Sequence, residues 1–76
     1  MIKLKDLKLG KKAKVVEISG GHALEKRLGT LGITPGRAIQ KVGSLGMHGP
    51  ATIKVGHSLV AIGRGMLEKI LVEPSE

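Results

Sequence analysis

The chain has 76 residues, of which 41% are hydrophobic, and a formal net charge of +7 from 13 basic and 6 acidic side chains. A chain of this length and composition folds as one domain, 1–76, with a small core. The absence of cysteine excludes disulfides and thiolate metal sites, and it fits a reducing compartment. The positive charge favours an anionic partner, such as nucleic acid, a membrane surface or an acidic protein face.

The first segment, "MIKLKDLKLGKK", is rich in lysine and lacks the apolar stretch of about 7 to 15 residues that a signal peptide contains. No apolar run approaches the ~20 residues that cross a bilayer. We therefore expect a cytoplasmic protein. We interpret the lysine cluster as a solvated face, and the alternative is a track for phosphate groups.

The first predicted strand follows the glycine turn in "LKLGKK" and covers "AKVVEI", 13–18, which is rich in β-branched residues. After "SGG" the periodicity changes to that of a short helix starting at His22. Leu24, Leu28 and Leu31 fall at i, i+4 and i+7 and form one apolar face. A helix this short does not persist alone, so we expect it to lie on the sheet.

The end of the helix is predicted from Gly32. If Gly32 is the left-handed residue just past the helix, Leu31 is the C-cap. Leu28 and Ile33 then occupy the two positions whose side chains touch in a Schellman ending.

A turn signal follows at "TPGR", 34–37. Pro35 presets the first central φ of a type II turn and Gly36 supplies the positive second φ, so the chain reverses into a strand. Gly29, inside the helix, costs about 1 kcal/mol relative to alanine. It either lets backbone or a partner approach closely or is simply tolerated.

The rest of the chain alternates short strands with turns. Strands are predicted at "AIQKV", 38–42, "ATIKV", 51–55, "LVAI", 59–62, and "KILVE", 69–73, with a loop "GSLGMHGP" after the first and a helical turn "GRGMLE" before the last. The sequence therefore predicts a mainly β fold, a small five-stranded barrel with one short helix inserted between strands one and two.

Motifs for catalysis and metal binding are incomplete. "GHSLV" begins like the nucleophile elbow of hydrolases, but Val60 replaces its last glycine, and the glycines fit neither phosphate-binding fingerprint. His22, His48 and His57 lie in separate loops or turns without a second ligand at metal spacing. The acidic residues are scattered. We therefore predict no enzyme activity, no catalytic residues, no metal site and no cofactor.

The alternative function is nucleic-acid binding, because small basic barrels bind RNA or DNA through phosphates. The sequence has no Phe, Tyr or Trp to stack on single-stranded bases, and its basic residues are dispersed. We expect no specific nucleic-acid partner.

The order of the motifs resembles that of the FeoA family, small cytoplasmic companions of the ferrous-iron transporter FeoB. The resemblance covers "LKDLKLGKKAKVVEISGG", then "RLGTLGITPGR", then "ATIKVGHSLVAIGRGMLEKILVE". Its most specific part is Arg27-Leu28 followed by "LGITPG", 31–36. The chain departs from the family pattern at Met66-Leu67 and at Met47-His48.

The resemblance implies an SH3-like barrel and a non-enzymatic accessory role in Fe²⁺ uptake, through contact with the cytoplasmic region of FeoB. Such contact would be the protein's only link to the membrane. The resemblance brings no catalytic or metal-binding residues with it.

The candidates for partner binding are Arg27 on the helix and Leu45, Met47 and His48 in the glycine-rich loop. Arginine is favoured at interfaces, and exposed aliphatic and thioether groups adapt to a partner. The alternatives are that Arg27 is a solvated or structural residue and that Leu45 plugs one end of the barrel. Self-association stays open.

Overall fold

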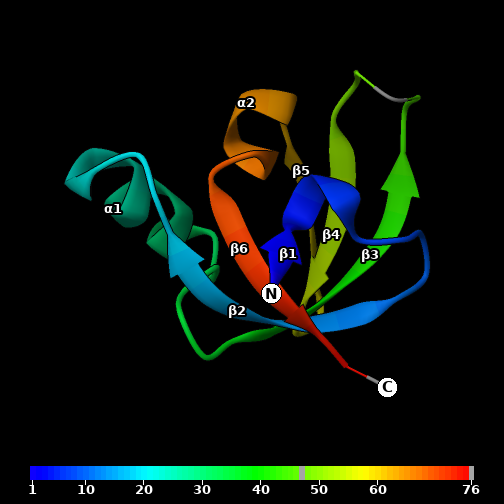
Figure 1. The fold of residues 1–76 in the computed structure, drawn as a ribbon, viewed down its shortest axis with the longest axis horizontal. Helices are drawn as coiled ribbons and strands as arrows, with labels where there is room; N and C mark the ends of the chain where they lie inside the picture. Colours follow the sequence, from blue (N-terminus) through cyan, green and yellow to red (C-terminus); the bar gives the residue numbers. More distant parts are fainter. Residues whose placement is uncertain (47, 76) are drawn as a thin grey trace.

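The computed structural model describes residues 1–46 and 48–75 (Figure 1). Its elements are β1 (Ile2–Lys3), the 3-10 turn η1 (Leu4–Asp6), β2 (Lys12–Ile18), α1 (His22–Thr30), β3 (Ala38–Ser44), β4 (Ala51–Val55), β5 (Ser58–Ile62), α2 (Arg64–Leu67) and β6 (Ile70–Pro74). No helix in this described part of the chain is long and apolar enough to span a membrane.

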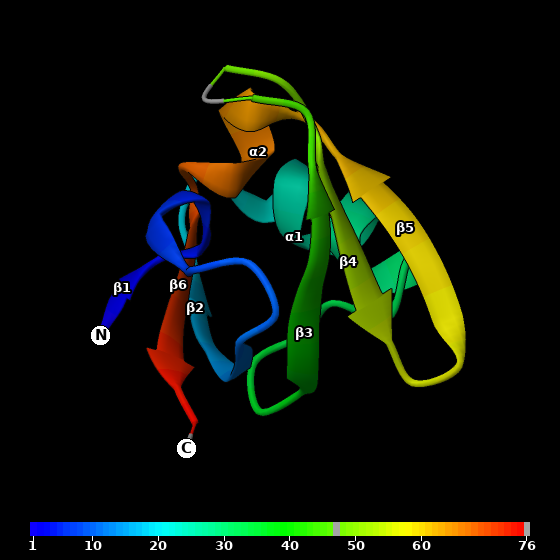
Figure 2. The ribbon, with the colours of Figure 1, turned by 90° about the vertical axis from the view of Figure 1, so that its right-hand side faces the viewer.

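The strands in the described residues form one antiparallel sheet in the order β1-β6-β2-β3-β4-β5. Strand β6 pairs with both β1 and β2, so segments from the two ends of the sequence lie side by side. Figure 2 shows the sheet bent, with β6 and β2 on one side and β3, β4 and β5 on the other. Register shifts at Val15–Glu17 and Lys41–Gly43 mark irregularities in β2 and β3, and bulges of this kind increase local twist.

The core lies inside the bend. Strand β4 shows how alternation builds it, because Ala51, Ile53 and Val55 point inward while Lys54 points to solvent. The buried hydrophobic residues are all aliphatic: Leu4, Leu7, Ala13, Val15, Ile18, Leu28, Ile33, Ile39, Ala51, Ile53, Val55, Ile62, Leu67, Ile70 and Val72. Both short helical turns contribute to it, η1 through Leu4 and α2 through Leu67.

The predicted mainly β fold is confirmed, with α1 between β2 and β3, which are the first two of the five predicted strands. The predicted strand count is wrong, because β1 adds a sixth strand to the sheet. With two residues, β1 is too short for alternation to reveal it. The sheet is also not closed, since β1 and β5 are its two edges and do not pair with each other.

The predicted helix ending is confirmed in detail. Leu31 is the C-cap and Gly32 has φ +85°. The N–H of Ile33 donates to the carbonyl of Leu28 at 3.0 Å, and the N–H of Gly32 donates to the carbonyl of Gly29 at 3.0 Å. These are the two hydrogen bonds of the Schellman motif. Leu28 and Ile33 are fully buried, so the ending also attaches α1 to the core.

The turn at 34–37 also has the predicted features. Gly36 has φ +92°, and the N–H of Arg37 donates to the carbonyl of Thr34 at 3.0 Å. The N–H of Gly36 donates to the carbonyl of Val15 at 2.7 Å, which attaches the turn to β2. The turn therefore starts β3 in register beside β2.

Candidate functional site

The structure separates the predicted partner-binding residues into two places. Arg27 is exposed on α1, whereas Leu45 and His48 are exposed in the loop between β3 and β4. Figure 1 shows α1 on the opposite side of the molecule from this loop. Met47 lies outside the described residues. Arg27 therefore does not share one surface with Leu45 and His48.

The β3–β4 loop is closed by its own backbone. The N–H of Leu45 donates to the carbonyl of Pro50 at 3.1 Å, and the Ser44 hydroxyl donates to the carbonyl of Gly46 at 3.2 Å. A side chain at Gly49 would overlap the carbonyl of Leu45, so only glycine fits there. The side chain of Leu45 is 74% exposed, which contradicts the alternative that it plugs one end of the sheet.

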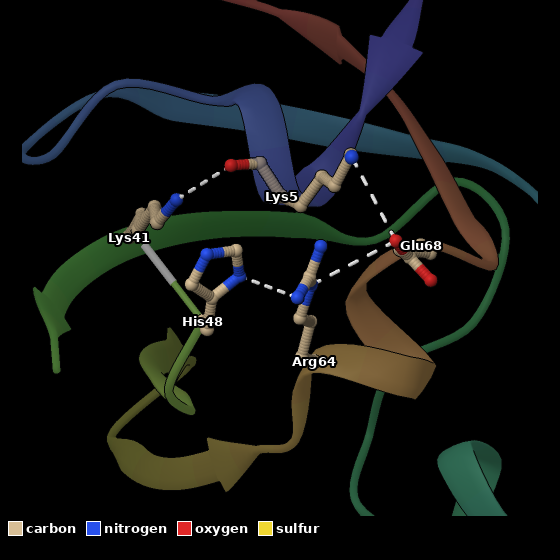
Figure 3. A network of polar contacts seen from close by, with 5 residues as sticks. All are labelled: Lys5, Lys41, His48, Arg64 and Glu68. Carbon is tan, nitrogen blue, oxygen red and sulfur yellow. Dashed lines mark hydrogen bonds and ion pairs between the residues drawn. The ribbon is translucent and has the colours of Figure 1, made fainter. Parts of the chain in front are cut away.

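A cleft of about 240 Å³ lies between this loop, η1, β3 and α2. Figure 3 shows the polar side chains around it, contributed by all four of these elements. The residues that line the cleft are Lys5, Asp6, Lys41, Ser44, Gly46, His48, Gly49, Ala51, Arg64 and Leu67. Lys5, Lys41 and Arg64 are basic and Asp6 is the one acidic residue of this lining, so the cleft is basic.

Lys41 is the buried cation of the cleft. It is 7% exposed, and its Nζ donates to the carbonyls of Leu7 at 2.9 Å and Lys5 at 3.1 Å. These hydrogen bonds connect β3 to the η1 segment. No carboxylate among the described residues lies within 4 Å of its Nζ. The Lys41 ammonium is therefore hydrogen-bonded but not neutralised.

On the other side of the cleft, Arg64 holds the ring of His48. Its Nη1 contacts His48 Nδ1, and because a guanidinium only donates, Nδ1 accepts and carries no proton in this contact. Glu68 Oε1 lies 3.8 Å from Arg64 Nε and 3.7 Å from Lys5 Nζ. Both distances are short enough for ion pairs but too long for hydrogen bonds. They are partly exposed, so each contributes little to stability.

The sequence analysis named His48 but not Lys5, Lys41 or Arg64, which line the same cleft. For Lys41 a signal existed, because it lies two residues after the inward-facing Ile39 and so shares its face of the strand. The i, i+4 spacing of Arg64 and Glu68 around a predicted helical turn was a second signal. The approach of Lys5 to this group depends on tertiary folding.

The histidines and carboxylates do not cluster. In the described ranges, no three His, Asp or Glu side chains gather around a space that would hold a metal ion. His22 lies 3.9 Å from Glu25 on α1, well away in sequence from the loop that carries His48. The cleft itself offers ionic binding by Lys5, Lys41 and Arg64 and hydrogen bonding by the imidazole of His48.

The bent antiparallel sheet with one helix inserted after β2 defines a small SH3-like domain. FeoA from Stenotrophomonas maltophilia, solved in complex with zinc and described as a prokaryotic SH3 domain protein, has this fold. It superposes with a TM-score of 0.80 over 96% of this chain and 91% of that chain, at 23% identity. The sequence itself matches the FeoA domain over residues 2–74, and the chain belongs to the FeoA family.

Other FeoA structures are similar over nearly the whole chain. A crystal structure described as an iron uptake regulatory protein, FeoA, has 36% identity and a TM-score of 0.88, covering 97% of this chain and 96% of that one. FeoA from Chlorobium tepidum, solved by NMR, has 25% identity and a TM-score of 0.89, covering 99% of this chain and 71% of that one. A comparison with curated protein sequences gives no match.

Proposed function

We propose that this protein is a cytoplasmic, non-enzymatic accessory protein of bacterial ferrous iron uptake that acts by binding the cytoplasmic region of FeoB. The observation that carries the proposal is the FeoA domain match over residues 2–74. Among the similar structures, one is described as an iron uptake regulatory protein and another is suggested as an activating factor for ferrous iron transport.

The surface around the β3–β4 loop supports a binding role. Leu45 offers an exposed apolar group, and the adjacent cleft offers cations from Lys5, Lys41 and Arg64. Apolar anchors contribute affinity at protein interfaces, whereas charged groups set orientation and association rate. Leu45 stands between two residues that line the cleft, Ser44 and Gly46, so we assign this loop and cleft as the main FeoB-binding surface. Arg27 on α1 is a separate candidate contact.

Iron uptake in a strain that lacks the native protein tests the proposal. Leu45→Asp and Met47→Asp should lower ⁵⁵Fe²⁺ uptake and the affinity for the FeoB cytoplasmic region. Leu45→Asp should change the free energy of unfolding by no more than about 0.5 kcal/mol, as surface substitutions usually do, because Leu45 is exposed. Leu59→Asp is the matched control, because Leu59 is 65% exposed on β5 and outside this loop.

Arg27 is tested in the same strain. Arg27→Glu should also lower uptake if α1 touches the transporter, and Lys26→Glu, at the next exposed position of α1, is its control. If Leu45→Asp, Met47→Asp and Arg27→Glu all fold and support full ferrous uptake, this surface assignment is wrong. If the wild-type protein neither binds FeoB nor restores uptake, the proposed function is wrong.

A further inference from the structure

We infer that the cleft between η1, the β3–β4 loop and α2 binds one carboxylate, supplied by an acidic side chain of the partner protein. The site consists of three cations that line the cleft, namely the buried Lys41, Lys5 and Arg64 (Figure 3). The identity of the partner rests on the proposed function, but the carboxylate site is argued from the cleft itself.

Lys41 places a buried positive charge in the cleft. A buried ammonium is costly unless it is paired, and backbone carbonyls solvate the charge without neutralising it. Lys41 is 7% exposed and its Nζ uses two of its three N–H groups, on Leu7 and Lys5. It lines the cleft with no described carboxylate within 4 Å. An anion in the cleft would supply the missing counter-charge.

Arg64 and Lys5, which also line the cleft, have unused hydrogen-bond donors. Arg64 has five N–H donors, and its one hydrogen bond to a described side chain goes to His48. Lys5 and Arg64 share Glu68 Oε1 at 3.7 and 3.8 Å, beyond hydrogen-bond distance. Both cations therefore keep donors for a ligand. The contact from Arg64 also orients the His48 ring in the lining of the cleft.

The balance of charge around the cleft favours a carboxylate over a phosphate. Three cations, Lys5, Lys41 and Arg64, stand against two carboxylates, those of Asp6 and Glu68, and His48 is neutral when it accepts from Arg64. The difference is one positive charge. A carboxylate matches it with one negative charge, whereas a phosphate group carries about −1.5 to −2 at pH 7.

The space fits this occupant. About 240 Å³ is far more than the roughly 10–15 Å³ that one water needs, so the cleft has room for a carboxylate and part of its side chain. Leu45, exposed in the loop that borders the cleft, is placed to contact apolar atoms next to the acidic residue of the partner. The site is therefore suited to bind an acidic residue in a partly apolar segment of the partner.

The site is tested first with acetate as the probe, on the full chain labelled with ¹⁵N. Acetate should shift the amide signals of Gly49, Ala51 and Leu67 in a saturable way, and inorganic phosphate at equal ionic strength should bind more weakly. Lys41→Met and Arg64→Gln should each weaken acetate binding at least tenfold. Lys14→Met is the control, because it removes the same charge from an exposed position on β2.

The outcomes separate clearly. No saturable shift with acetate, tighter binding of phosphate, or equal weakening by Lys14→Met would each overturn the inference. Arg64 is exposed, so Arg64→Gln keeps the test valid if Lys41→Met fails to fold.

The second test uses the FeoB cytoplasmic region. Lys41→Met and Arg64→Gln should each weaken its binding at least tenfold. Replacing one Asp or Glu of the FeoB region by Asn or Gln should weaken binding equally, and combining that change with Lys41→Met or Arg64→Gln should weaken it no further. If FeoB binds these variants as it binds wild type, the inference is wrong and the proposed function stands. If acetate saturates the cleft but FeoB does not bind, the proposed function fails and the carboxylate site stands.

Discussion

Replacing Gly29 by alanine should make the protein more stable. Gly29 lies inside α1 with a φ outside the left-handed region, and a Cβ there would meet only Thr34 Cγ2, at 3.9 Å. That distance is an ordinary van der Waals contact, so the described part of the chain has no close approach that requires glycine. Alanine is favoured over glycine in a helix by about 1 kcal/mol.

We expect Gly29→Ala to gain about 0.5 to 1 kcal/mol, because the position is in the last turn of a nine-residue helix, where the effect is smaller. A domain of this size changes its Tm by roughly 4 to 8 °C per kcal/mol. Urea unfolding followed by circular dichroism at 222 nm, with equal m-values for both proteins, measures the difference.

Gly32→Ala is the matched control three residues later. Gly32 has φ +85°, and its Cβ would lie 3.2 Å from Val55 Cγ1, so this variant should lose more than about 1 kcal/mol. If Gly29→Ala is destabilised, or if Gly32→Ala is as stable as wild type, our account of the α1 ending is wrong. If Gly29→Ala is more stable but binds FeoB more weakly, a partner approaches the helix at Gly29.

Three further predictions follow from the core, the histidines and the charge. Leu28→Ala should lose about 2 to 5 kcal/mol of an expected total stability of roughly 4 to 11 kcal/mol. Leu31→Ala, at the exposed C-cap of α1, should lose about 1 kcal/mol or less in urea unfolding. Anaerobic calorimetry should show no stoichiometric Fe²⁺ or Zn²⁺ site, and a tight site lost on replacing His48 or His57 would contradict this. The protein should bind DNA or RNA only weakly and without sequence preference. Sub-micromolar, sequence-selective binding would support the nucleic-acid alternative, in which the slope of log K against log salt is about −0.9 for each duplex phosphate contacted.

The parts of the fold that sequence predicts well are those with local causes. The end of α1 depends on one left-handed glycine and on two residues five apart, Leu28 and Ile33, so "LGIT" contains the information needed. The turn at Pro35-Gly36 is equally local. The long strands were predicted within one or two residues, because β-branched residues and alternation act inside each strand.

The parts that were missed have long-range causes. Strand β1 has two residues and exists because β6, nearly 70 residues later, offers it an edge. No pattern within "IK" distinguishes this pairing from a loop. The barrel was inferred from five short strands with turns at close spacing, and whether the edges β1 and β5 meet depends on the bend of the whole sheet.

Lys41 shows why the candidate site was the least predictable part. Alternation in β3 places it on the inward face with Ile39, but a lysine in that position normally argues for the opposite orientation. It is buried because the η1 segment brings the carbonyls of Lys5 and Leu7 to its Nζ from more than thirty residues away. The sequence therefore identified the family. The buried position of Lys41, whose charge we propose to bind a carboxylate of the partner, depends on the packing of η1 against β3.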